Sequence, residues 1–296
     1  MKKKCFLLLM VVSILFSRVA YADDLNQVDI NVDSSGISDD GKIGSQFSIV
    51  SAKVSFPEIE NYYPQPGDAY VIQKAQLRSA ASTNSPSKGT LEIGTKVHII
   101  EYEGDWARTD NGYIYAGLLS DKYTFKANIH GKNTNSLRYA GYLYKSICDL
   151  EEPLKTLAEN TSITLVDSQK NLCNEYEELG ERTAGYTLHY VGTNKSEIRI
   201  WANTGSMQKD IIHELGHVLD YSEDGSKGVI YSDADEWNQI FEEEKDVYYK
   251  KLSNNKHDVS DQKEYFASCV ESYTLKPEEF ESIAPKSYDY IQKFFC

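Results

Sequence analysis

The segment His213-Glu214-Leu215-Gly216-His217 constrains the fold of this 296-residue chain more than any other feature. Residues four apart in a helix lie on the same face, one turn from each other, so a helix here directs both imidazoles to one point. Glu214 projects beside that point. Neighbouring apolar residues favour a helix whose other side is buried: Ile211, Ile212, Leu215, Val218 and Leu219. The pattern H-E-x-x-H is typical of a zinc site with the acid as general base, and a helix with two core or surface histidines is the alternative.

A catalytic zinc ion needs three protein ligands and a water molecule, so the third ligand must come from elsewhere. The remaining histidines are His98, His130, His189 and His257, and His98 lies in a strand-rich region where a structural role is expected. A predicted amphipathic helix at about 261–274 carries two carboxylates, Glu264 and Glu271. The residues alone leave open which of them completes a site with two histidines and one glutamate.

The N-terminus has the three parts of a secretory signal peptide. Met1-Lys2-Lys3-Lys4 is basic, Cys5 to Phe16 is almost wholly apolar, and Ala20-Tyr21-Ala22 has the small residues that signal peptidase recognises. The apolar run is too short to span a bilayer as a mature helix, although a retained membrane anchor is the alternative. We therefore expect residues 1–22 to be removed and the protein to be secreted, in the extracellular space or on the cell wall.

The charge of the chain limits its partners. The net charge is −14, and the charged residues of the predicted signal peptide are all basic, so the mature chain is more acidic still. An acidic surface argues against nucleic acid as a partner, and against an anionic membrane once the signal peptide is cleaved.

Four cysteines remain after the predicted cleavage, and an even number in an exported protein favours disulfides. Pairing of sequence neighbours is expected, which joins Cys148 to Cys173 and Cys269 to Cys296. Three connectivities are open, and four buried free thiols are the alternative.

The chain divides into four segments: a signal peptide (1–22), an acidic linker or pro-segment (23–67), a strand-rich unit (68–122) and a larger unit (123–296). In the strand-rich unit, Asp110-Asn111-Gly112 between two short apolar runs predicts a hairpin, and the whole predicts a small β-barrel. The larger unit combines predicted helices with β-rich runs at 186–191 and 197–202, so the fold class is α+β.

The strand-rich unit resembles a bacterial SH3-type domain. The resemblance rests on five motifs: Leu77–Thr83, Gly89-Thr90-Leu91, Gly94-Thr95-Lys96-Val97, Gly104-Asp105-Trp106 and Gly112-Tyr113-Ile114. Such domains bind cell wall or peptides, or serve only as spacers. A cell-wall ligand for residues 68–122 is what this resemblance implies.

Residues from about 130 to 296 resemble the catalytic domain of anthrax toxin lethal factor and the related Pro-Pro endopeptidases. The matching pieces are His213–His217, Glu264-Tyr265-Phe266-Ala267 and Ala284-Pro285-Lys286-Ser287-Tyr288. The resemblance implies a zincin-type metallopeptidase of the gluzincin class, with one zinc ion per chain bound by His213, His217 and Glu264. It implies that Glu214 is the base and that Glu271 supports a ligand or lies on the surface.

The same resemblance implies a mode of substrate binding, and the chain differs from the family at one position. The family binds an extended peptide beside a strand that precedes the motif helix, which here would be Glu197–Ala202, and it favours prolines around the cleaved bond. An ordinary core strand is the other interpretation of this run, and the two are compatible. A tyrosine normally stands seven residues before the glutamate ligand, but this chain has His257 there. Either His257 donates to the oxyanion or another tyrosine, such as Tyr248 or Tyr249, takes that role.

These observations predict a secreted zinc endopeptidase that acts on extracellular or cell-surface proteins. A peptidase of wall cross-links is one alternative. Another is a wall- or host-binding module with an inactive toxin-like zinc domain, although the intact Glu214 argues against this alternative.

Overall fold

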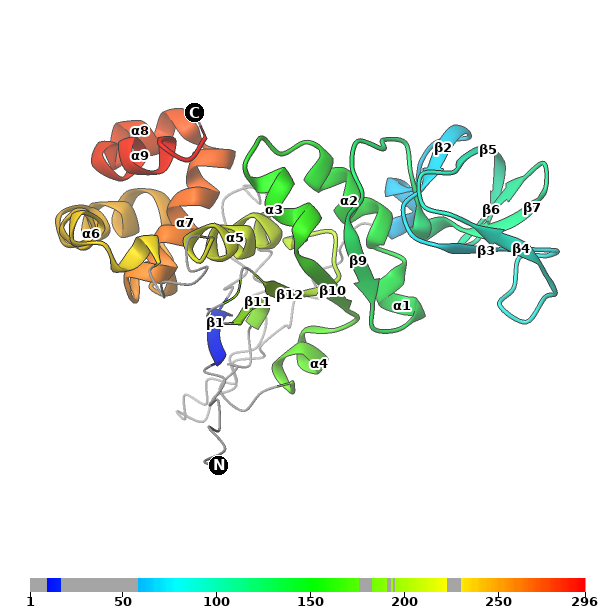
Figure 1. The fold of residues 1–296 in the computed structure, drawn as a ribbon, viewed down its shortest axis with the longest axis horizontal. Coiled ribbons are helices and arrows are strands. Elements are labelled where there is room, and N and C mark those ends of the chain that lie inside the picture. Colours follow the sequence, from blue (N-terminus) through cyan, green and yellow to red (C-terminus); the bar gives the residue numbers. More distant parts are fainter. Residues whose placement is uncertain are drawn as a thin grey trace, which may run out of the picture.

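The structure is a computed structural model that describes residues 10–16, 58–175, 183–190, 193, 195–222 and 230–295. Two sheets lie at different places in the molecule, and most of the helices gather around one of them (Figure 1). The fold is a mixture of α and β structure, as the sequence predicted.

A seven-stranded sheet forms the first unit. Its strands follow the order β4-β3-β7-β6-β5-β2-β8, and they are β2 (Gly67–Val71), β3 (Ala75–Arg78), β4 (Ser87–Leu91), β5 (Lys96–Glu103), β6 (Trp106–Thr109), β7 (Gly112–Tyr115) and β8 (Leu119–Ser120). The predicted hairpin is confirmed, because Thr109 pairs with Gly112 across a two-residue turn. Gly112 has φ 147°, and a Cβ there would lie 2.4 Å from the carbonyl oxygen of Arg78. The SH3-type assignment of this unit stays a prediction.

A five-stranded sheet forms the centre of the second unit, in the order β1-β11-β12-β10-β9. The strands are β1 (Met10–Phe16), β9 (Asn128–Gly131), β10 (Ser162–Val166), β11 (Thr183–Tyr190) and β12 (Ser196–Trp201). Strands β9, β10 and β12 are parallel, whereas β11 is antiparallel to both β12 and β1. Strand β1 falls within the predicted signal peptide, which stays a prediction.

The position of β12 corrects one expectation. The sequence placed an extended substrate beside Glu197–Ala202, yet β12 pairs with β10 on one side and with β11 on the other. Both hydrogen-bonding edges of this strand are filled, so it has no edge to offer a peptide.

The described part of the second unit also has nine α-helices: α1 (Thr134–Leu137), α2 (Ala140–Cys148), α3 (Leu154–Asn160), α4 (Gln169–Cys173), α5 (Met207–Asp220), α6 (Asp235–Tyr248), α7 (Gln262–Leu275), α8 (Pro277–Ile283) and α9 (Pro285–Gln292). Helices α2, α3 and α5 lie on one face of the sheet and α4 on the other (Figure 1). The main core joins that first face to α6, α7 and α9. None of the described helices is long and apolar enough to cross a membrane.

One predicted disulfide is wrong. Cys148 and Cys173 are both free thiols. Cys148 belongs to the main core on the α2 face, whereas Cys173 ends α4, whose Leu172 packs in a separate cluster on the opposite face. The sheet therefore separates the two sulfur atoms. Cys269 is also free and buried, and its predicted partner Cys296 lies outside the described residues.

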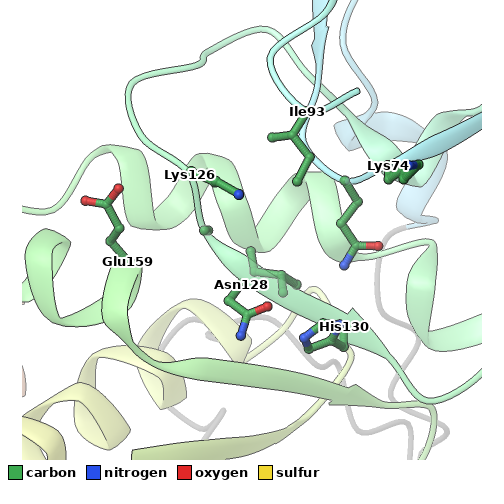
Figure 2. Close-up of a pocket in the computed structure, with 9 residues that line it drawn as sticks. Lys74, Ile93, Lys126, Asn128, His130 and Glu159 are labelled. Atoms are coloured by element: carbon green, nitrogen blue, oxygen red, sulfur yellow. The ribbon is translucent and has the colours of Figure 1, made fainter. Parts of the chain in front are cut away.

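A hollow with a volume of about 590 Å³ lies where the first unit meets β9. Figure 2 shows its lining, which includes Lys74, Ile93, Lys126, Asn128, His130 and Glu159. His130, one of the candidate ligands in the sequence, therefore faces this hollow and takes no part in the cluster described next.

Candidate metal centre

Two helices bring the candidate ligands together. Helix α5 carries the motif histidines. Asp261 precedes α7, and its side chain accepts hydrogen bonds from the backbone N–H groups of Lys263 and Glu264 at 2.9 and 3.0 Å. This N-cap fixes the first turn of α7, which carries Glu264. The helices cross at Gly216, where an added Cβ would lie 2.8 Å from the Cα of Ala267. Only glycine permits this approach, which brings the Glu264 carboxylate within reach of both imidazoles.

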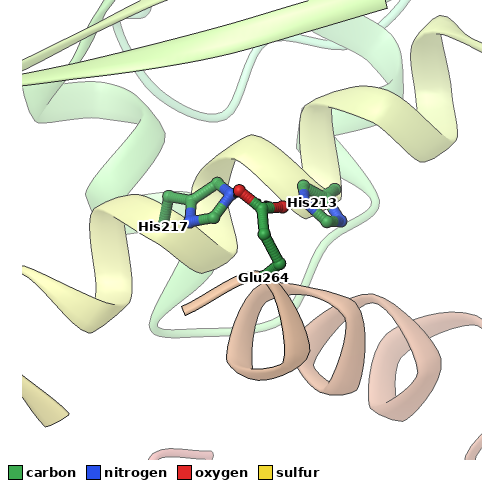
Figure 3. A group of neighbouring side chains, drawn as sticks. All are labelled: His213, His217 and Glu264. Carbon is green, nitrogen blue, oxygen red and sulfur yellow. Dashed lines mark hydrogen bonds and ion pairs between the residues drawn. The ribbon is translucent and has the colours of Figure 1, made fainter. Parts of the chain in front are cut away.

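The ligand atoms of His213, His217 and Glu264 all lie within 4.8 Å of one another (Figure 3). Oε2 of Glu264 is 3.3 Å from Nε2 of His213 and 3.5 Å from Nε2 of His217. Tetrahedral zinc with ligands at about 2.0–2.1 Å separates its ligand atoms by about 3.3–3.4 Å. These two separations fit such an ion, so the choice of Glu264 over Glu271 as the third member agrees with the geometry.

All three members of this triad are buried, as is Glu214. Within the described part of the chain, neither ring nitrogen of His217 has a hydrogen-bond partner. A buried imidazole without hydrogen-bond partners is costly in a folded protein, and a bound cation that accepts a lone pair from Nε2 would remove part of that cost. The residues present therefore fit a divalent metal ion.

The charges of the triad are strongly coupled. Burial alone lowers the pKa of His213, but the carboxylates of Glu264 and Glu271 raise it well above its ordinary value. Burial likewise raises the pKa of Glu264, yet His217 and His213 together bring it far below the usual range. The carboxylate of Glu264 is therefore ionised at neutral pH, which is the form that binds a metal.

Glu271 lies behind the triad, in contact with a ligand residue, which was one of the two positions expected for it. Its Oε2 is 3.6 Å from Nδ1 of His213, and its Oε1 is 3.3 Å from the ammonium group of Lys209. A carboxylate on the far side of a metal-binding imidazole fixes the orientation of the ring and raises its basicity.

His257 lies beside the triad, on the short helical turn His257–Val259. Its Nδ1 is 3.2 Å from Oε2 of Glu264, and its side chain is 13% exposed. Burial lowers the pKa of His257. The hydroxyl of Tyr248, the alternative donor, is buried elsewhere, 2.8 Å from the Ser268 carbonyl oxygen and from the Ser272 hydroxyl.

The other two histidines lie away from this centre. His98 is exposed on β5 beside Asp68, at 3.2 Å. His189 on β11 contacts the Ser196 hydroxyl at 3.1 Å and stacks on Tyr221. Neither belongs to the triad.

Two residues of β11 also touch the centre, and the sequence analysis did not identify them. The Thr187 hydroxyl lies 2.6 Å from Oε2 of Glu214, and Gly185 faces the same side chain. Thr187 belongs to a run that the sequence marked only as β-rich (186–191), and Gly185 lies just before that run, within β11. Contacts between a strand and a helix 27 residues later leave no local pattern by which they could have been found.

Comparisons with known proteins give a family model and a solved structure that are similar to part of this chain. The family model of anthrax toxin lethal factor, N- and C-terminal domain, matches residues 154–294, a stretch that includes α5 and α7. The structure of the Pro-Pro endopeptidase PPEP-2 from Paenibacillus alvei has 16% sequence identity and a TM-score of 0.38, and the alignment covers 57% of this chain and 97% of that one. A likeness of that degree is too weak to assign a fold. No curated protein matches the chain.

Proposed function

We propose that residues 123–296 form a zinc-dependent endopeptidase domain with one zinc ion per chain. The observation that carries this proposal is the buried convergence of His213, His217 and Glu264 beside the carboxylate of Glu214. The match of residues 154–294 to the lethal factor family model supports it. A zinc ion in this place would polarise a peptide carbonyl and lower the pKa of a bound water molecule.

Glu214 has the properties of the general base. Burial raises the pKa of its carboxyl group to about 7, although both motif histidines oppose the shift. A base with a pKa near the working pH accepts a proton readily and returns it readily. Glu214 would take the proton of the attacking water and deliver it to the leaving amine.

His257 is the proposed donor to the developing oxyanion. It stands seven residues before Glu264, on the side of the triad that is partly open to solvent. An imidazole N–H can donate as a phenol does. His257→Ala should lower kcat by about 10- to 1000-fold, up to the loss caused by removing a single oxyanion donor, and should leave zinc bound. Full activity in this variant would assign the donor to another residue.

The proposed substrate is an extended segment of an extracellular or cell-surface protein, with Pro-rich sites as the first candidates. We place it beside β11, because Gly185 and Thr187 of this strand face Glu214. Strand β1, in the predicted signal peptide, pairs with the outer edge of β11. Cleavage of the signal peptide would free that edge for a peptide.

The direct test compares substrates for the purified mature protein. An unfolded protein, Pro-rich peptides and peptidoglycan fragments are incubated with wild type and with Glu214→Gln. We expect peptide cleavage by wild type, abolished by chelators, and a loss of about 100- to 10,000-fold in the variant. Cleavage of the peptidoglycan fragments but not of the protein or the peptides would show that the substrate is the cross-links of the cell wall. Zinc binding without cleavage of any of the three would favour a binding module with an inactive domain.

A further inference from the structure

Strand β11 holds the carboxylate of Glu214 from two sides. On one side the Thr187 hydroxyl lies 2.6 Å from Oε2 of Glu214 and 3.2 Å from its backbone carbonyl oxygen. The hydroxyl has one proton, and the shorter contact shows that it donates to Oε2. All of these atoms are buried, so water does not compete for the bond.

On the other side, Gly185 leaves no room for a side chain. A Cβ at this position would lie 2.9 Å from Oε1 of Glu214, 3.2 Å from its Cγ and 3.3 Å from its Cδ. All three nearest atoms belong to the end of one side chain. An added methyl group would therefore displace the Glu214 carboxylate before it disturbed the backbone.

The two oxygen atoms of Glu214 consequently differ. Oε2 has the Thr187 hydroxyl, whereas Oε1 has no hydrogen-bond partner among the residues that the structure describes. A buried carboxylate oxygen without a partner is costly, and such a cost in a functional centre indicates a ligand or a reacting group.

We propose that Thr187 and Gly185 are positioning residues that hold Glu214 in one orientation, with Oε2 anchored to β11 and Oε1 left to accept the proton of the substrate water. The inference rests on the proposed peptidase function. Neither residue contacts the reacting atoms. Their effect arises because a glutamate side chain has several rotamers, and the misplacement of a base by a fraction of an ångström lowers the reaction rate.

Three variants separate this role from a merely structural one. Thr187→Val keeps the shape of the side chain and removes the hydroxyl, Thr187→Ser keeps the hydroxyl, and Gly185→Ala adds the methyl group. Thr161→Val is the matched control, because Thr161 is also buried and donates to the Leu157 carbonyl oxygen at 2.7 Å, outside the centre. Each variant is measured for kcat and KM on a peptide, for zinc content and for thermal stability.

We expect Thr187→Val and Gly185→Ala to keep one zinc per chain and an unchanged KM, and to lose about 10- to 100-fold in kcat. Thr187→Ser should regain most of the rate, and Thr161→Val should keep it. Full kcat in Thr187→Val, or an equal loss in Thr161→Val, would overturn the inference while the wild-type peptidase activity stood.

Crystal structures of zinc-loaded wild type and Thr187→Val give a readout that does not depend on turnover. Wild type should show a single Glu214 rotamer with Oε2 on Thr187, and the variant should show a displaced or divided carboxylate. An unchanged Glu214 in the variant contradicts the inference, whether or not the protein cleaves peptides.

Discussion

At the scale of single residues, the carboxylates around the triad have different tasks. Glu264 reaches both Nε2 atoms, whereas Glu271 reaches only the far nitrogen of His213. Glu264→Ala should abolish zinc binding, and Glu271→Ala should weaken it by about 10- to 100-fold. Lys209→Ala, which removes the other ion-pair partner of Glu271, is the control, and it should weaken zinc binding less than Glu271→Ala does. Competition with a chromophoric chelator measures the affinities. Zinc retained in Glu264→Ala but lost in Glu271→Ala would reverse the two assignments.

Asp220 gives a prediction about pH. Its carboxylate accepts hydrogen bonds from the N–H and hydroxyl groups of Ser232, both at 2.7 Å, but burial raises its pKa to about 7. The folded chain thus keeps a proton that the unfolded chain loses near pH 4, so the stability from this group falls as pH rises from about 4 to 7. Relative to Asp220→Asn, wild type should lose up to about 4 kcal/mol over that range, at about 1.4 kcal/mol per pKa unit. Urea unfolding with chelator present measures this difference, and a pH-independent difference would contradict the raised pKa.

At the scale of elements, the crossing of α5 and α7 sets the width of the metal site. Gly216→Ala would place a methyl group 2.8 Å from the Cα of Ala267, where only a helix shift relieves the contact. Helix propensity alone would stabilise the variant by about 1 kcal/mol. A loss of stability would therefore show that the steric contact outweighs the gain in helix propensity. We expect lower thermal stability and a zinc affinity at least about tenfold weaker, because the shift moves Glu264 away from the imidazoles. A stabilised variant with unchanged affinity would show that the helices have room.

The same two helices show how far the sequence leads. The predicted helix at about 261–274 differs from α7 by one residue at each end, and α5 includes the whole motif as predicted. The predicted amphipathic character of α7 is wrong, because Glu264 to Val270 are buried without interruption, which takes in every side of the helix. The start of α6 could not be read from the sequence, because Ser232, a residue type that commonly caps a helix, binds Asp220 instead and the helix starts after Ala234. Strands β9 and β10 were not predicted, because short runs in a parallel sheet lack polar alternation. The residues alone left Glu264 and Glu271 equivalent, because residues seven apart lie on the same face of a helix, and only the family resemblance selected Glu264.

At the scale of the whole molecule, the first unit packs on α2, away from the triad. A Cβ at Gly141 would lie 2.2 Å from the Leu119 carbonyl oxygen, and Arg138 binds Asp105 at 3.0 Å. Gly141→Ala should therefore separate the units, lower thermal stability and leave zinc affinity unchanged. Gly141→Ala and Gly216→Ala both add one methyl group to a helix. Comparing the two variants therefore separates the effect of the contact between the two units from that of the contact between α5 and α7. A loss of zinc affinity in Gly141→Ala would mean that the first unit helps to shape the metal centre.

Under the proposed function, three buried side chains, His213, His217 and Glu264, hold one catalytic zinc ion beside Glu214. Metal analysis of the purified mature protein, together with its Glu214→Gln and Glu264→Ala variants, tests this most directly. We predict about one zinc per chain in wild type and in Glu214→Gln, and none in Glu264→Ala, with peptide cleavage only in wild type. Wild-type protein that cleaves peptides at full rate with no transition metal bound would contradict the account.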